Sequence, residues 1–345
     1  MLQRTKRRYF AVLQTSKMTE DSSLPVVMTT TGMTQITGGS TMASSSSRGT
    51  ELYLYCALVV IGVVGTVTNA LILYAMVASK QHNKQVLIFN QNVLDFFSSF
   101  FMVVTNSIKL CDIYLTGSVG YWLCVLLLND CLVWWGTNGS VTNLVFITVE
   151  RYLKVVHPVW SKNKLRNWMI YLAVAFSWIS GVIVNAIGLF PISEVVDGTC
   201  NPFVTANNET YTIIILASCF LPAYVVVLSI FVFCYWRILI IIRRQARVMA
   251  AHDAAGPTAA QTTFNQIQSN IVKTMILVSA LYAVSWLPMD IYLSYAILNP
   301  NSTSYGGYHA TMSIAFLHVC TNPFIYATKF DPVKEVLLQL ITCKK

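Results

Sequence analysis

The chain has 345 residues, of which 55% are hydrophobic and only 11% are charged, and its formal net charge is +9 at pH 7. A soluble domain averages about 25% charged residues, so this composition excludes a water-soluble globular protein and predicts a membrane protein. The basic residues stand between apolar runs, as in loops that face anionic lipid headgroups, which argues against a nucleic-acid partner.

Seven apolar runs are long enough to cross a bilayer, since a spanning helix needs about 20 apolar residues. They cover roughly residues 52–78, 86–109, 121–150, 168–190, 212–242, 271–298 and 308–328. We therefore predict an all-α membrane protein, a seven-transmembrane helix bundle over residues 52–328, with a short inner loop at residues 245–266. No internal repeat is visible, which counts against a transporter built from duplicated halves.

The two ends of the chain are expected to lie outside the bundle. Residues 1–51 are predicted to be a disordered extracellular N-terminal tail, because they are rich in Ser, Thr and Gly and hold little that could form a core. Residues 329–345 are predicted to form a cytosolic amphipathic helix and tail. At Cys343 two interpretations stay open, a palmitoyl anchor and a plain free thiol. Four apolar residues share one face of this short eighth helix: Val333, Val336, Leu337 and Leu340.

The charges of the loops orient the chain. One side carries most of the basic residues near the spans, Arg166 among them, and the other carries acids such as Glu194, with Lys109 as the main exception. By the positive-inside rule the protein is a multi-pass plasma-membrane protein with an extracellular N-terminus and a cytosolic C-terminus. The glycosylation sequons at Asn208 and Asn301 both fall on the predicted outer side, in agreement with the charges.

The outer side also carries cysteines and a turn signal. Cys124 and Cys200 lie in an oxidising compartment and can tie the third span to the second outer loop, although Cys111 is also available for pairing. Asp197-Gly198, between β-favouring residues just before Cys200, indicates a hairpin turn.

Polar residues inside the spans need partners, because lipid offers none. Asn69, Asp95 and Asn322 can meet if the first, second and seventh spans close into a bundle, and Ser140 can join them from the third. Two interpretations remain open: a structural hydrogen-bond cluster, and a water-filled site for a cation.

Three prolines lie inside predicted spans: Pro222, Pro288 and Pro323. A proline removes one backbone hydrogen bond and kinks a helix, which a membrane helix tolerates where neighbours satisfy the freed carbonyl. Their placement in the last three spans predicts a bundle that can change shape in this region.

Several motifs follow one another along the spans. They are Asn69, Leu94-Asp95, Glu150-Arg151-Tyr152, Trp178, Pro222, Ser285-Trp286-Leu287-Pro288 and Asn322-Pro323-Phe324-Ile325-Tyr326. Together they resemble the motifs of the rhodopsin-like (class A) G-protein-coupled receptors over about residues 52–343, most closely the peptide-receptor branch. The chain departs from the family in several places, two of which concern the third and seventh spans. Cys124 precedes Arg151 by 27 residues (151 − 124), about two more than usual, which predicts a bulge at the top of the third span, and His318 replaces a common asparagine of the sodium network.

The resemblance implies a receptor rather than an enzyme. A ligand on the outer side would shift a two-state bundle, and Trp286 and the Pro288 kink would relay the change. Arg151 would then leave Glu150 as the cytosolic face opens to a heterotrimeric G protein. The other residues of the implied switch are Tyr152, Asn322, Pro323 and Tyr326. No cofactor is implied apart from an allosteric sodium ion near Asp95, and the surrounding partners are membrane lipids.

Two ligand classes of the family lack their marker residues here. Amine receptors carry an aspartate eighteen residues before the arginine, and this chain has Val133 there (151 − 18), or Cys131 when the count starts from Cys124. Opsins need a Schiff-base lysine six residues before the motif asparagine, and this chain has Phe316 (322 − 6). The resemblance therefore favours neither an amine nor retinal as the ligand.

The presumed ligand pocket carries two acids. On the third span, four residues recur at helical spacing on one face: Asp130, Val133, Trp134 and Thr137. Asp290 lies four residues after Trp286, on the same face of the sixth span and one turn closer to the outside. Two acids that open into one pocket favour a ligand with a cationic group. The alternative for Asp130 is a solvated helix end.

The ligand is predicted to be a neuropeptide with a basic group, because a hairpin in the second outer loop resembles the lid of peptide receptors. Two alternatives remain. One is a receptor of the same fold for a lipid or small molecule, and the other is a seven-span transporter or channel in which Asp95 is a residue of the path. Transport currents that are independent of a G protein would distinguish the transporter.

Overall fold

The computed structural model of the chain describes residues 39–111, 113–188, 193–202, 209–251, 259–299, 305–329 and 331–342. The chain divides into two units, Met1–Ser46 and Ser47–Lys345. Of the first unit only residues 39–46 are described, as the beginning of helix α2, and the helix bundle belongs to the second.

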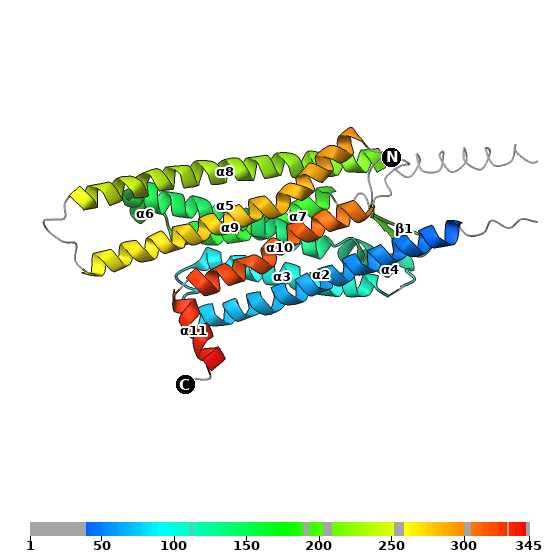
Figure 1. The fold of residues 1–345 in the computed structure, drawn as a ribbon, viewed down its shortest axis with the longest axis horizontal. Coiled ribbons are helices and arrows are strands. Elements are labelled where there is room, and N and C mark those ends of the chain that lie inside the picture. The colour runs from blue at the N-terminus through cyan, green and yellow to red at the C-terminus, as the bar shows by residue number, and fades with distance from the viewer. Residues whose placement is uncertain are drawn as a thin grey trace, which may run out of the picture. The chain divides into compact units, whose positions relative to one another are not determined.

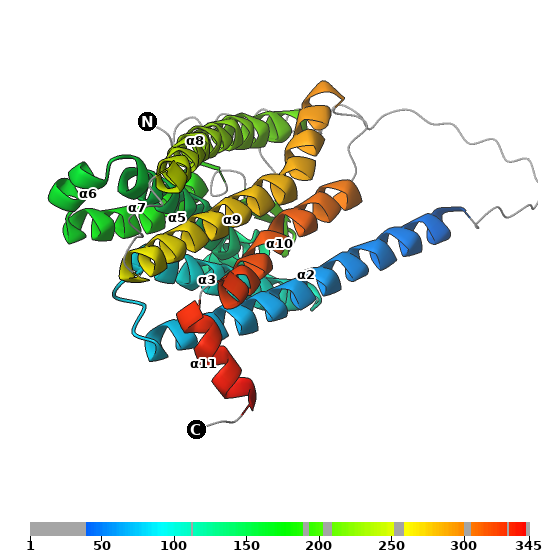
Figure 2. The same cartoon turned by 60° about the vertical axis from the view of Figure 1, so that its left-hand side comes forward.

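Seven long helices follow one another in the described residues: α2 (Gly39–Ala78), α3 (Val86–Lys109), α5 (Cys131–Val156), α7 (Asn167–Gly188), α8 (Glu209–Ala251), α9 (Ala259–Leu298) and α10 (Tyr305–Lys329). The shorter elements are α4 (Gly117–Leu123), the π-helix η1 (Cys124–Leu128), α6 (Pro158–Lys164), strands β1 (Ser193–Val196) and β2 (Thr199–Pro202), and α11 (Asp331–Thr342). Helix α9 lies between α8 and α10 and packs against both (Figures 1 and 2).

Membrane-spanning character is plain in six stretches of the described residues, which are long and apolar enough to cross a bilayer. Helix α10 is long enough but more polar, since it carries residues such as His309, His318 and Asn322, and these three side chains are buried. The helix packs against α9 and α3, so its polar residues find partners inside the bundle. The predicted all-α, seven-transmembrane bundle is confirmed.

Small residues set the distance between helices α3 and α5. A Cβ atom added at Gly136 would lie 2.8 Å from the Cβ of Ser98, and one added at Gly139 would lie 2.9 Å from Leu94 Cδ2. Any side chain at these positions would push the helices apart, as at other close helix crossings in membranes.

The predicted bulge at the top of the third span is confirmed. Residues Cys124–Leu128 form a π-helix, and the chain then breaks at Asn129 and Asp130 before α5 begins. Asp130 stands at the N-cap of α5 with φ 56°, in the left-handed region that few side chains adopt. The extra residues between Cys124 and Arg151 are therefore absorbed by a wider helical turn followed by a break.

The outer hairpin and its disulfide are also confirmed. Strands β1 and β2 pair antiparallel with Val196 opposite Thr199, so Asp197 and Gly198 form the two-residue turn, both with positive φ. A Cβ atom at Gly198 would lie 2.0 Å from the Tyr114 ring, so only glycine fits there. Cys200 on β2 is bonded to Cys124. Cys111, the other candidate for pairing, is a free and exposed cysteine.

Two predicted boundaries are wrong. Helix α2 begins at Gly39, so the segment 39–51 is helical rather than disordered. The segment contains no proline, so the helix of the apolar span can continue into it despite its Ser and Gly content. The predicted inner loop at 245–266 is largely helical as well, since α8 continues to Ala251 and α9 begins at Ala259. These flanks are rich in Ala, Gln, Arg and Met, which propagate a helix well.

The short eighth helix is present as α11. It follows α10 directly and leaves it at an angle (Figure 1). Val333 is fully buried, and Val336 and Leu337 pack against the core, whereas Leu340 is 45% exposed. The predicted apolar face therefore joins the bundle through its first turns, while its end faces away from it.

Candidate functional site

One end of the site is centred on Arg151, whose side chain is buried. Its guanidinium group lies 3.3 Å from the Glu150 carboxylate and donates a hydrogen bond to the side-chain oxygen of Gln85, at the start of α3. Glu150 is also paired with Lys154, one turn further along α5, at 2.6 Å. The motif arginine is thus held by one acid and one neutral acceptor from two different helices.

A second group of polar contacts is centred on Tyr235. The hydroxyl group of Tyr235 on α8 donates to or accepts from Thr148 on α5 and Ser279 on α9, both at 2.9 Å, and lies 3.2 Å from the Met275 carbonyl oxygen. These contacts join α5, α8 and α9 within electrostatic range of Arg151. Tyr326, the last residue of the Asn-Pro-x-x-Tyr motif, is buried within electrostatic range of Tyr235, Arg151 and Asp95.

The polar network at mid-bundle is built around Asp95. Ser140 donates a hydrogen bond to one carboxylate oxygen at 2.5 Å, and Asn322 donates to the other at 2.8 Å. The Gln91 amide lies 3.5 Å from both oxygens and also donates to Ser140. Asn69 is buried nearby, but its amide donates to the backbone of Gly65 and Val319 rather than to Asp95. The structure therefore brings together three of the four predicted residues at the carboxylate.

The hydrogen-bond donors around Asp95 determine whether its carboxylate has room for a sodium ion. A carboxylate offers about four lone-pair positions, and Ser140, Asn322 and the bifurcated Gln91 amide direct four hydrogen bonds toward those of Asp95. A cation would have to displace Gln91, so the residues do not fit the ion without that movement. The contacts favour the hydrogen-bond-cluster interpretation.

Trp286 lies at the centre of an aromatic cluster in the outer half of the bundle. Its indole N–H donates to His318 Nδ1 at 3.3 Å, and its ring makes an edge contact with Trp134 at 6.1 Å between centroids. Trp134 in turn contacts Phe316, and Tyr282 lies 5.7 Å from Trp286. Trp134 and Trp286, both predicted site residues, are therefore in contact. A displacement of either ring would change contacts with residues of α5, α9 and α10.

Asp290 is the acid that the structure leaves with the least compensation. The residue is buried with 5% exposure, and its Oδ2 atom has no hydrogen-bond partner among the described residues. Its electrostatic neighbours are Tyr224 on α8 and Tyr282 on α9. A buried carboxylate oxygen without a donor is costly, and a cationic ligand group is the partner that would remove this cost.

Asp130 has a different environment from the one predicted. It is neither a solvated helix end nor an uncompensated acid, because its carboxylate is buried and lies 2.5 Å from Lys109 Nζ. Lys109 also lies over the Tyr55 ring at 5.8 Å. The left-handed backbone at Asp130 turns its side chain toward α3 instead of continuing the face of α5. Of the other predicted residues on that face, Val133 is a core residue and Thr137 bonds to Ser98 on α3.

Sequence reasoning missed several residues of these networks, and three of them form contacts with predicted site residues: Gln85, Gln91 and Lys109. A signal existed for two of them. Gln91 stands one helical turn before Asp95 and shares its face, and Lys109 is the outer lysine that broke the charge rule and needed an acidic partner. Gln85 carried no signal, since an uncharged residue at a helix start has no characteristic spacing. The predicted modification sites Asn208, Asn301 and Cys343 lie outside the described residues.

The described residues form seven long helices, with a disulfide just before the third of them and a buried arginine near the other end of that helix. This is the arrangement of a seven-transmembrane bundle. The chain belongs to the family "7 transmembrane receptor (rhodopsin family)", whose profile matches residues 68–326. Members of this family are receptors rather than enzymes.

Individual relatives agree with this assignment. The chain is 23% identical to an allatostatin-A receptor of Bombyx mori over 82% of the chain and 78% of the relative. It is 22% identical to the neuropeptide Y receptor type 4 of Rattus norvegicus, over 84% and 78%. Squid rhodopsin has the same fold, with a TM-score of 0.67 at 18% identity, over 85% of this chain and 82% of that one.

Proposed function

We propose that the chain is a plasma-membrane receptor for an extracellular peptide with a basic group, and that it signals through a heterotrimeric G protein. The basic group is proposed because a buried carboxylate oxygen of Asp290 has no hydrogen-bond partner among the described residues. Asp290 is on the same helix as Trp286 and one turn away. Two further observations support a peptide. One is the hairpin that is disulfide-bonded to the third span, and the other is that a relative is named as a neuropeptide receptor.

The proposed signal runs from the acid to the arginine. A cationic group at Asp290 changes the position of α9 next to Trp286, and the Pro288 kink allows that change without breaking the helix elsewhere. The cytosolic ends of α8 and α9 then part from Arg151, which leaves Glu150 and Gln85. A ligand drives this only as far as it prefers the open bundle to the closed one.

Charge removal at Asp290 tests the proposal. Cells that express the chain are screened with basic, amidated neuropeptides by calcium and cAMP readouts, and responses are compared at equal surface level. A charge-assisted hydrogen bond contributes roughly 1.5–3 kcal/mol, so Asp290→Asn should weaken the potency of a basic peptide about tenfold to a hundredfold. Arg151→Ala should abolish the response. The matched control is Asp197→Asn, which removes an exposed outer acid at a turn where asparagine is also accepted.

The outcomes separate the alternatives. Equal potency in Asp290→Asn and in the unmodified receptor would contradict the acidic pocket and leave the receptor standing. Silence to peptides with responses to lipids or small molecules would replace the proposed ligand class. Currents that persist after Arg151→Ala and without any G protein would point to a transporter or channel.

A further inference from the structure

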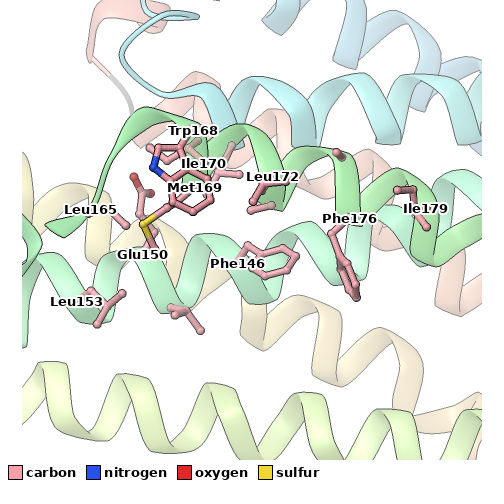
Figure 3. A pocket seen from close by; sticks show the side chains of 14 residues that line it. Phe146, Glu150, Leu153, Leu165, Trp168, Met169, Ile170, Leu172, Phe176 and Ile179 are labelled. Atoms are coloured by element: carbon pink, nitrogen blue, oxygen red, sulfur yellow. The ribbon is translucent and has the colours of Figure 1, made fainter.

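A cavity of about 520 Å³ lies between α5 and α7, away from the residues of the candidate site except Glu150. Figure 3 shows Phe176 and Ile179 at one end of it and Trp168, Leu165 and Glu150 at the other. Apart from Glu150 its lining is almost wholly apolar, so one end can hold a polar group and the remainder only hydrocarbon.

This cavity opens to the bilayer and not to the interior of the bundle. The lining residues Trp168, Leu172, Phe176 and Ile179 are 57%, 57%, 54% and 53% exposed. From Trp168 to Ile179 is 11 residues (179 − 168), or about 16 Å along a helix at 1.5 Å per residue. Half of a hydrocarbon core of about 30 Å is about 15 Å, so the groove is as long as one leaflet is deep.

The chain segment next to the polar end of the groove is rich in basic residues. Residues 150–168 contain a single acid, Glu150, which is paired with Arg151 and Lys154. The same stretch contains three further cations beside the groove-lining residues Leu165 and Trp168. These cations are Lys162, Lys164 and Arg166, and all three are exposed. An occupant with a negative group at this end and a hydrocarbon chain along α7 is complementary in both charge and length.

We propose that the groove between α5 and α7 binds a two-chain anionic phospholipid of the cytosolic leaflet. One acyl chain lies along Leu172, Phe176 and Ile179, and the headgroup contacts the basic residues of α6 and the start of α7. Trp168 is at the boundary of the two parts, where an indole ring with an apolar body and a polar edge is favoured. The selection is for headgroup charge, since any phospholipid could supply the acyl chains.

Lipid retention by the purified full-length chain tests this proposal. The protein is equilibrated with equal amounts of phosphatidylserine and phosphatidylcholine in mixed micelles, and the lipids that stay bound are counted by native mass spectrometry. The unmodified chain should retain phosphatidylserine in preference. Lys162→Gln, Lys164→Gln and Arg166→Gln should each weaken this preference by up to about fivefold, the effect of one basic residue near an anionic surface. Arg243→Gln and Arg244→Gln, exposed cations at the inner end of α8, are the matched controls.

A second variant separates the groove from general surface charge. Ala175 lines the groove and is exposed, so Ala175→Trp places a bulky ring in the path of an acyl chain without entering the core. It should reduce bound phosphatidylserine about as strongly as the charge variants do. Val232→Trp, at a 67% exposed position on α8, should leave it unchanged. Equal retention of the two lipids by the unmodified chain, or equal losses in the groove and control variants, would overturn the proposal.

Discussion

At the scale of single residues, Arg151 is held in a way that its own motif does not specify. Glu150 lies 3.3 Å from the guanidinium group and is also paired with Lys154. The ion pair between Glu150 and Arg151 therefore restrains Arg151 only weakly. Gln85 accepts a hydrogen bond from Arg151 across the gap between α3 and α5. Since Gln85 makes no capping bond to its own helix, this contact is the evident role of its side chain.

The first prediction concerns this hold. Gln85→Ala should raise ligand-free signalling about tenfold to a hundredfold, because a hydrogen bond to a charged group contributes roughly 1.5–3 kcal/mol and here stabilises the closed state. Gln85→Glu, which turns the contact into an ion pair, should lower it. The measurement is basal G-protein activation at equal surface level. Unchanged basal signalling in both variants would show that the contact does not restrain Arg151.

The second prediction concerns sodium at Asp95. While Gln91 fills the acceptor positions of the carboxylate, agonist affinity should change by less than about twofold when sodium chloride replaces choline chloride. In Gln91→Ala two of the four hydrogen bonds are gone, and a cation can take their place beside Ser140. Sodium should then lower agonist affinity clearly. A strong sodium effect in the unmodified receptor would mean that Gln91 moves aside without cost.

At the scale of elements, the break in the third span shows what the sequence could and could not predict. The spacing between Cys124 and Arg151 is longer than in the family, and a helix can hold added residues only in a bulge. The spacing therefore predicted a bulge in this part of the span, and the structure has one there. Spacing did not predict that Asp130 would adopt a left-handed backbone and turn to Lys109. That pairing is between residues 21 apart (130 − 109) on separate elements, and only the packed bundle brings them together.

The third prediction is that this ion pair holds the broken span to α3. Lys109→Gln leaves the Asp130 charge buried and unpaired and should destabilise the receptor by about 3–5 kcal/mol. Asp130→Asn keeps a residue that tolerates the left-handed backbone. Combined with Lys109→Gln it should recover much of the lost stability. Thermal unfolding of the ligand-free purified chain measures this double-mutant cycle, and simple additivity of the two single losses would contradict a direct pair.

At the scale of the whole molecule, the two halves of the bundle differ in how they are connected. The outer half is held by aromatic contacts around Trp286, and the middle by hydrogen bonds around Asp95. The inner half is held by polar contacts around Tyr235 and Arg151. Motif positions such as Asp95 and Asn322 were predictable, because a polar residue in lipid needs a partner and the family motif says where it lies. The identity of each partner was not predictable. Uncharged residues such as Gln91 form hydrogen bonds that depend on side-chain geometry, and no periodic pattern in the sequence indicates that geometry.

The fourth prediction tests whether the inner ties favour the closed bundle. The Tyr235 hydroxyl joins α8 to α5 and α9, the helices whose separation would expose Arg151. Hydrogen bonds between membrane helices contribute about 0.6 kcal/mol each, so the loss of two in Tyr235→Phe should raise basal signalling roughly sevenfold or less. Ligand affinity without G protein should change little, because Asp290 lies in the other half of the bundle. Tyr171→Phe, at a 60% exposed position, is the control. A fall in basal signalling would mean that the hydroxyl group stabilises the open state instead, and the inner ties would then form part of activation rather than oppose it.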